Sequence, residues 1–89
     1  MIEREVIIAN KLGLHARAAA KLVSTASGFG ASVELKRDTQ QVNGKSIMGV
    51  MMLAASKGTR LILAVDGEDE EQAMQALETL IAERFGESE

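Results

Sequence analysis

The chain contains no cysteine, proline, tryptophan or tyrosine, and its only aromatic residues are Phe29 and Phe85. Without cysteine, neither a disulfide framework nor a thiolate metal site can form. The scarcity of aromatic side chains removes the stacking platform that single-stranded nucleic-acid binders use. A formal net charge of −3 also argues against a basic nucleic-acid interface. No apolar run is long enough for a signal peptide or a membrane span. We therefore expect a cytoplasmic protein that neither binds nucleic acid nor inserts into a membrane.

The residues that are present suffice for one small domain. Hydrophobic residues make up 46% of the 89 residues, so a core of Ala, Val, Ile, Leu and Met can form. There is no linker and no low-complexity segment, and we expect residues 1–89 to form a single domain. No long exposed apolar face demands a dimer, so we expect a monomer.

Hydrophobic periodicity predicts seven elements in the order β-α-β-β-α-β-α. Helices on one face of a four-stranded sheet would give an α+β fold, but periodicity leaves the order of the strands open. We expect strands at residues 2–8, 32–37, 40–42 and 60–65, and helices at residues 16–27, 47–53 and 69–85. In the first helix, the residues expected to be buried are Ala16, Ala19, Ala20, Val23 and Ala26.

The only histidine, His15, stands at the start of the first predicted helix, where a capping Ser, Thr, Asp or Asn is usual. Arg17 then places a cation in the first turn, where the helix dipole disfavours it by about 0.3–1 kcal/mol. Both features are explained if the helix start binds an anion. They suggest phosphoryl chemistry on the His15 ring. The simpler alternatives are an ordinary surface histidine and a solvated helix charge.

A second segment runs from Asn43 to Leu53. It begins with the turn signal Asn43-Gly44, and Ser46 then has the chemistry of an N-cap. The short helix after it carries four large apolar side chains on about two turns, so some of them must face outward. Methionine-rich exposed patches suit docking on several partners. We expect Met52 to lie in the core and the docking patch to comprise Leu14, Ile47, Met48 and Met51.

The stretch Gly13-Leu14-His15-Ala16-Arg17, together with the segment from Asn43 to Leu53 at the matching distance, resembles HPr. The HPr family comprises the phosphocarriers of the bacterial phosphoenolpyruvate-dependent phosphotransferase system. The likeness covers essentially the whole chain. It implies an open-faced β-sandwich, in which three helices cover one face of a four-stranded antiparallel sheet.

The resemblance also implies a mechanism. His15 accepts a phosphoryl group on Nδ1 from enzyme I and passes it to enzyme IIA proteins. Arg17 and the backbone N–H groups of Ala16 and Arg17 bind the phosphate. No cofactor and no metal are implied, and the protein is a substrate of other enzymes, not an enzyme itself.

Two points remain open. Ala18 stands where many family members carry proline. Alanine at this position resembles a subgroup of proteobacterial carriers that includes the nitrogen-related branch. Either the sugar branch or that regulatory branch is therefore possible. Ser46 is either a plain N-cap or, as the resemblance implies, a site for HPr kinase/phosphorylase.

Two other functional classes compete with a carrier. An acylphosphatase-like hydrolase has a similar size, but its arginine-bearing phosphate loop has no match here. A regulatory module with an idle histidine is the other class, although family members of that kind typically lack the active histidine.

Overall fold

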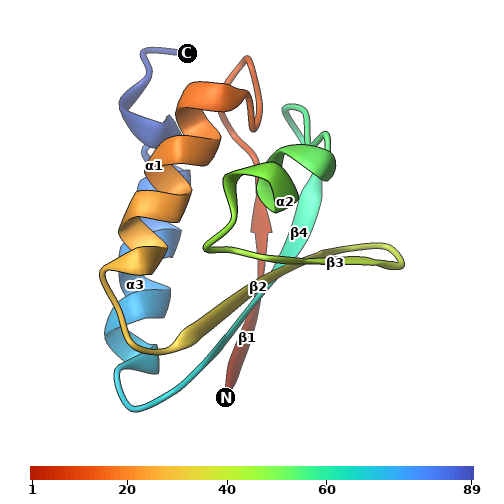
Figure 1. Ribbon diagram of the computed structural model, residues 1–89. Coiled ribbons are helices and arrows are strands. Elements are labelled where there is room, and N and C mark those ends of the chain that lie inside the picture. Colours follow the sequence, from red (N-terminus) through yellow and green to blue (C-terminus); the bar gives the residue numbers. More distant parts are fainter.

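The computed structural model describes all of residues 1–89. The four strands pair antiparallel throughout and form one sheet in the order β1-β4-β2-β3. Three helices cover one side of the sheet, so the predicted element order and open-faced α+β class are confirmed (Figure 1). The elements are β1 Ile2–Ile7, α1 Ala16–Ser27, β2 Ser32–Arg37, β3 Gln40–Asn43, α2 Ile47–Met52, β4 Arg60–Asp66, α3 Glu70–Ala82 and the 3₁₀ turn η1 Arg84–Gly86.

Apolar side chains on one face of the sheet form the floor of the core. Val6 of β1 lies opposite Leu61 of β4, and Leu35 of β2 lies opposite Leu63. Because side chains alternate between the two faces of a strand, the neighbouring Glu5 is exposed on the open side. The helices cover the apolar face, and 21 buried residues form one continuous cluster beneath them.

Helix α1 buries a different set of residues from the one predicted. Its buried residues are Ala18, Ala19, Leu22 and Ala26. The prediction was wrong for Ala16 and Ala20, which are exposed, and Val23 is only partly buried. Leu22 is the largest apolar side chain of the helix, and it is fully buried together with Ala18, one turn earlier. The small alanines beside it let α1 lie close to α2 and α3.

Helix α2 is too short to bury all of its apolar side chains. Val50 is fully buried and Leu53, which caps the C-terminal end, is 1% exposed. Met52 lies on the other side of the helix and is 66% exposed, so the expectation that it belongs to the core was wrong. The helix has six residues, and positions 50 and 53 define its core face.

The predicted last helix is interrupted near its end. Helix α3 stops at Ala82, and Arg84 and Phe85 then adopt φ angles of 57° and 56°. This left-handed conformation is costly for residues with side chains, but it places the Phe85 ring fully inside the core. Lys21 Nζ donates to the carbonyl oxygen of Phe85 at 2.6 Å. The reversal brings the C-terminus back beside the start of α1 (Figure 1).

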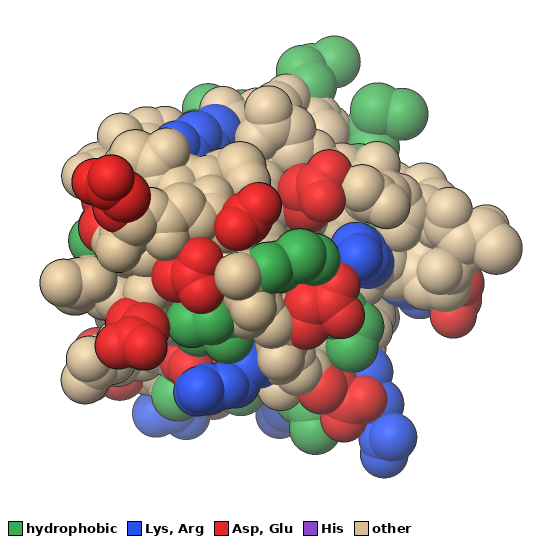
Figure 2. Space-filling model, turned by 90° about the horizontal axis from the view of Figure 1, so that it is seen from below, with side chains coloured by type: hydrophobic (Ala, Val, Ile, Leu, Met, Phe, Trp, Pro, Cys, Tyr) green, Lys and Arg blue, Asp and Glu red, His purple; other side chains and the backbone are tan.

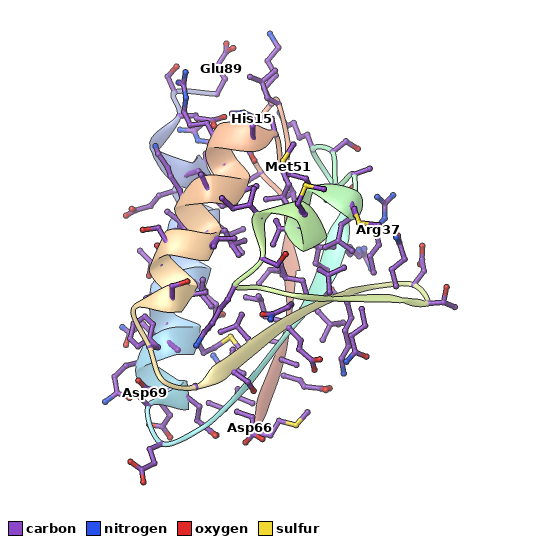
Figure 3. All side chains as sticks on the ribbon, viewed as in Figure 1. His15, Arg37, Met51, Asp66, Asp69 and Glu89 are labelled. Carbon is purple, nitrogen blue, oxygen red and sulfur yellow. The ribbon has the colours of Figure 1, made fainter.

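Two acidic residues at and just after the end of β4, Asp66 and Asp69, lie at the end of the molecule far from His15. Figure 3 shows Asp66 and Asp69 at one end and His15 and Glu89 at the other. Seen from the acidic end, carboxylate side chains are interspersed with Lys and Arg (Figure 2). None of the helices combines the length and the apolar character that a membrane span needs.

Replacing Asp69 by Asn is expected to make the protein's stability less sensitive to acid. The Asp69 carboxylate accepts hydrogen bonds from the backbone N–H groups of Gly30 (2.9 Å) and Ala31 (2.8 Å). These bonds hold the pKa of Asp69 below its usual value of 3.8. Because the folded-state pKa is depressed, the carboxylate stabilises the fold above the unfolded-state value, and this contribution is lost as the pH falls from about 4 through the folded-state pKa.

The measurement is the melting temperature of both proteins across the acid range. Asp69→Asn should melt lower at neutral pH and lose less on acidification below about pH 4. Parallel curves for the two proteins would contradict this account of Asp69.

Candidate functional site

The start of α1 has no side-chain cap. His15 occupies the N-cap position in extended conformation (φ −71°, ψ 176°), and its ring makes no capping hydrogen bond. The N–H of Ala19 donates to the carbonyl of His15 at 2.8 Å, at the start of the helical ladder. The N–H groups of Ala16, Arg17 and Ala18 come before this bond and therefore have no intrahelical acceptor. The helix start presents backbone donors beside the imidazole, as an anion site requires.

Arg17 is an exposed cation that makes no hydrogen bond or ion pair to another side chain. It lines an open pocket together with the His15 ring. An unpaired guanidinium at this point can donate two hydrogen bonds to one phosphate without first breaking an existing contact. The complete lining of the pocket is Lys11, Leu12, His15, Arg17, Glu87, Ser88 and Glu89.

Two side chains that the sequence analysis did not single out hold the His15 ring. Glu87 Oε2 lies 2.5 Å from His15 Nε2. Asn10 Nδ2 donates to Glu87 Oε1 at 3.0 Å and to the carbonyl of Gly13 at 2.8 Å. The hydrogen bond from Asn10, followed by that from His15, holds the pKa of Glu87 below its usual value of 4.5. No local pattern marks residues 77 positions apart as neighbours. The only signal was a polar Asn three residues after the end of β1.

Glycine at position 13 is required by the path of the loop that carries His15. Gly13 has a φ of +67°, and a Cβ there would lie 2.4 Å from the carbonyl oxygen of Ala55 and 2.8 Å from Cα of Ser56. This close approach lets the N–H of Leu14 donate to Ala55 at 2.8 Å. It also draws the Leu14 side chain into the core, where it is 5% exposed. The inclusion of Leu14 in a docking patch was therefore wrong.

Ser46 is the N-cap of α2, and its Oγ accepts a hydrogen bond from the N–H of Gly49 at 3.1 Å. The three other residues expected to dock partners are exposed: Ile47 by 45%, Met48 by 74% and Met51 by 41%. Figure 3 shows Met51 at the same end of the molecule as His15. We call Ile47, Met48 and Met51 the α2 patch.

The acidic residues do not assemble into a metal site. No group of three or more His, Asp or Glu side chains is placed to hold a metal ion.

Known proteins share both the sequence and the fold. Residues 2–83 match the family model described as the PTS HPr component phosphorylation site. A phosphocarrier protein HPr of Cupriavidus necator is 56% identical over 89 residues, covering 100% of both chains. The crystal structure of HPr-C-His from Thermoanaerobacter tengcongensis superposes with a TM-score of 0.96 at 47% identity, with full coverage of both chains. An HPr dimer from the same organism matches with a TM-score of 0.79 at 48% identity, covering 98% of this chain and 100% of that one. The chain therefore belongs to the HPr family, the phosphocarrier proteins of the phosphotransferase system.

Proposed function

We propose that this protein accepts a phosphoryl group on Nδ1 of His15 from phosphorylated enzyme I and passes it to enzyme IIA proteins. Arg17 and the N–H groups of Ala16 and Arg17 bind the phosphate oxygens. The protein is a carrier consumed and regenerated by other enzymes, and it does not turn over a substrate by itself. It works in the cytoplasm, where those enzymes act.

One observation carries this proposal: His15 stands at an uncapped helix start beside an unpaired arginine, in a pocket open to solvent. A phosphoryl group on the ring would meet the guanidinium, the free backbone donors and the positive end of the helix dipole. The added charge of about −1.5 to −2, as for other phosphorylated side chains, would be stabilised there. Without a bound phosphate, the backbone N–H groups at the start of α1 and the Arg17 guanidinium have no partners.

The test is incubation of the pure protein with phosphoenolpyruvate and catalytic amounts of enzyme I. We expect one acid-labile phosphoryl group per chain and no continuing release of phosphate. A parallel incubation with acyl phosphates separates this carrier from a hydrolase. Catalytic turnover of the acyl phosphate, or no labelling from enzyme I, would overturn the proposal.

We propose that the α2 patch is where partners dock. The three side chains are exposed and apolar, and Figure 3 shows that Met51 lies at the same end of the molecule as His15. A partner that covers them would also reach the imidazole. Flexible methionines can repack against different partner surfaces, as a carrier that meets both a donor and an acceptor requires.

Replacing Met48 by Glu is expected to slow phosphoryl transfer from enzyme I by about 10- to 100-fold, the loss typical of a desolvated docking residue. Met48 is 74% exposed, so the fold and the free energy of unfolding should be unchanged. Gln72→Glu, which adds the same charge at an exposed position of α3, is the matched control. Equal transfer rates for Met48→Glu and the control would count against docking at the α2 patch.

Ser46 supports a second, regulatory proposal. Its hydroxyl caps α2 directly before the α2 patch, so a phosphate there would place negative charge against a docking partner. We propose that an HPr kinase/phosphorylase modifies it. Incubation with that kinase and ATP should label the wild-type protein and not Ser46→Ala, and the labelled protein should accept phosphate from enzyme I more slowly.

The branch served by this carrier is decided by its acceptor. We propose transfer to sugar-specific enzyme IIA proteins, and the nitrogen-related enzyme IIA is the alternative favoured by Ala18. Offering the phosphorylated protein to both classes of acceptor and comparing transfer rates distinguishes them.

We further propose that the protein acts as a monomer. An HPr dimer is known among its structural relatives, so the oligomeric state is to be measured directly. Sedimentation analysis at micromolar concentration should give the mass of one chain, 9.5 kDa.

A further inference from the structure

Three side chains form a hydrogen-bonded series from the core to the His15 ring. Asn10 is fully buried, and its Nδ2 donates both to the Gly13 carbonyl and to Glu87 Oε1. The other oxygen of Glu87 contacts His15 Nε2 at 2.5 Å. The side chain of Glu87 is 16% exposed and that of His15 is 27% exposed. The ring is thus held at Nε2, and no hydrogen bond engages Nδ1.

This arrangement decides where the ring proton lies. Asn10 presents an amide donor to one oxygen of Glu87, which suits an ionised carboxylate. A carboxylate only accepts hydrogen bonds, so the short contact at its other oxygen requires a proton on Nε2. In a neutral imidazole with its proton on Nε2, Nδ1 carries the lone pair. Nδ1 is therefore ready to act as the nucleophile.

The charges around Glu87 favour its ionised form. The hydrogen bond from Asn10 is the main cause of its lowered pKa, His15 contributes next, and the cation of Lys21 adds a smaller effect. Lys11 and Arg17 line the same pocket, and Glu89 is the other acidic side chain there. Lys11 pairs with Glu89 at 3.5 Å, which partly offsets that negative charge.

We propose that Glu87, oriented by Asn10, is a positioning residue for phosphoryl transfer. It fixes the ring proton of His15 on Nε2, and its negative charge stabilises the positive charge that the ring gains. This inference rests on the proposed function. In the transfer, the lone pair of Nδ1 forms the new N–P bond. The bond between phosphorus and the donor atom breaks, and its electron pair stays with the donor. The proton remains on Nε2, so the ring becomes positive beside the Glu87 carboxylate.

Some enzymes use a carboxylate beside a histidine in the same way. In Ser-His-Asp triads, a carboxylate bound to one ring nitrogen fixes the tautomer and stabilises the imidazolium that forms. Here the nucleophile is the ring itself, and the carboxylate acts from the C-terminal segment. Removing the partner that orients a metal-ligating histidine typically costs about 10- to 100-fold, and we expect a loss of the same order for His15.

The variant Glu87→Gln keeps the size of the side chain and removes its charge. We expect two changes in the full-length protein. The ¹⁵N chemical shifts of His15 are measured at a pH high enough for the ring to be neutral. They should move from the Nε2–H pattern in the wild type to a mixture of tautomers in the variant. The rate of phosphoryl uptake from enzyme I should fall about 10- to 100-fold. A residue with only a structural role would not alter the tautomer.

The matched control is Glu83→Gln, which removes the same charge four residues earlier. Glu83 is exposed and its carboxylate makes no hydrogen bond or ion pair, so both readouts should equal those of the wild type. A wild-type tautomer pattern or a wild-type rate in Glu87→Gln would overturn the proposal. The NMR readout needs no phosphoryl donor. Failure of the proposed function would instead show as no labelling of the wild-type protein.

Discussion

His15→Ala should take up no phosphoryl group from phosphoenolpyruvate and enzyme I, whereas the wild-type protein takes up one. The expected loss is complete because the chain contains no other histidine. The variant should remain folded, since the His15 ring makes no capping hydrogen bond to α1 and Asn10 still holds Glu87. Phosphoryl incorporation is measured by mass spectrometry at neutral pH, and folding by circular dichroism. Acid-labile labelling of a folded His15→Ala would contradict the assignment.

Ser46→Ala is the matched control, because it also replaces the N-cap of a helix by alanine. Ser46 does make the capping bond, to Gly49, so its loss should lower the free energy of unfolding by about 1 kcal/mol. Phosphoryl uptake on His15 should be the same in Ser46→Ala as in the wild type. The two variants thus separate the capping role of a residue at a helix start from the chemical role.

Phe85→Ala should cause the largest loss of stability of the substitutions considered. The Phe85 ring is fully buried within the core cluster and is one of only two aromatic rings in the chain. Truncating a buried Phe removes its transfer free energy and leaves a cavity, which together lower the free energy of unfolding by about 3–5 kcal/mol. For a small domain this is a large share of the total stability. Urea denaturation measures the change.

Phe85 also anchors the segment that carries Glu87, two residues later. We therefore expect the Nε2–H tautomer of His15 to be less populated in Phe85→Ala wherever the variant remains folded. Phe29→Ala is the control, because that ring is only partly buried and lies in the loop between α1 and β2. Its loss of stability should be clearly smaller. Equal losses for the two rings would contradict the role given to Phe85.

The periodicity of the sequence was sufficient for the elements and their type. The strands expected at residues 2–8 and 60–65 agree with β1 and β4 to within one residue at each end. Periodicity was insufficient for the face of α1 and for the end of α3. Alanine is small enough to lie on either side of a helix, and Leu22 and the sheet decide which side is buried. The left-handed turn at Phe85 is stabilised by burial in the core, which no local propensity encodes.

The α2 patch shows the same limit. The composition of residues 47–52 required some apolar side chains to face outward, and three of the expected residues do. None of the three methionines in this segment turns inward, although the sequence analysis expected Met52 to do so. Val50 and Leu53 fill the core beneath α2, so Met52 is left in solvent, and Leu14 is drawn inward by the turn at Gly13.

Local sequence is sufficient for the α+β order of elements, the uncapped helix start at His15, the adjacent cation of Arg17 and the cap at Ser46. Each of these depends on residues that are close together along the chain. The strand order, the burial of Leu14 and the contact of Glu87 with His15 depend instead on packing between distant segments. That contact joins residues 72 positions apart. It exists because a strained turn at Phe85 is stabilised by the core and carries the acidic C-terminal segment back to the start of α1.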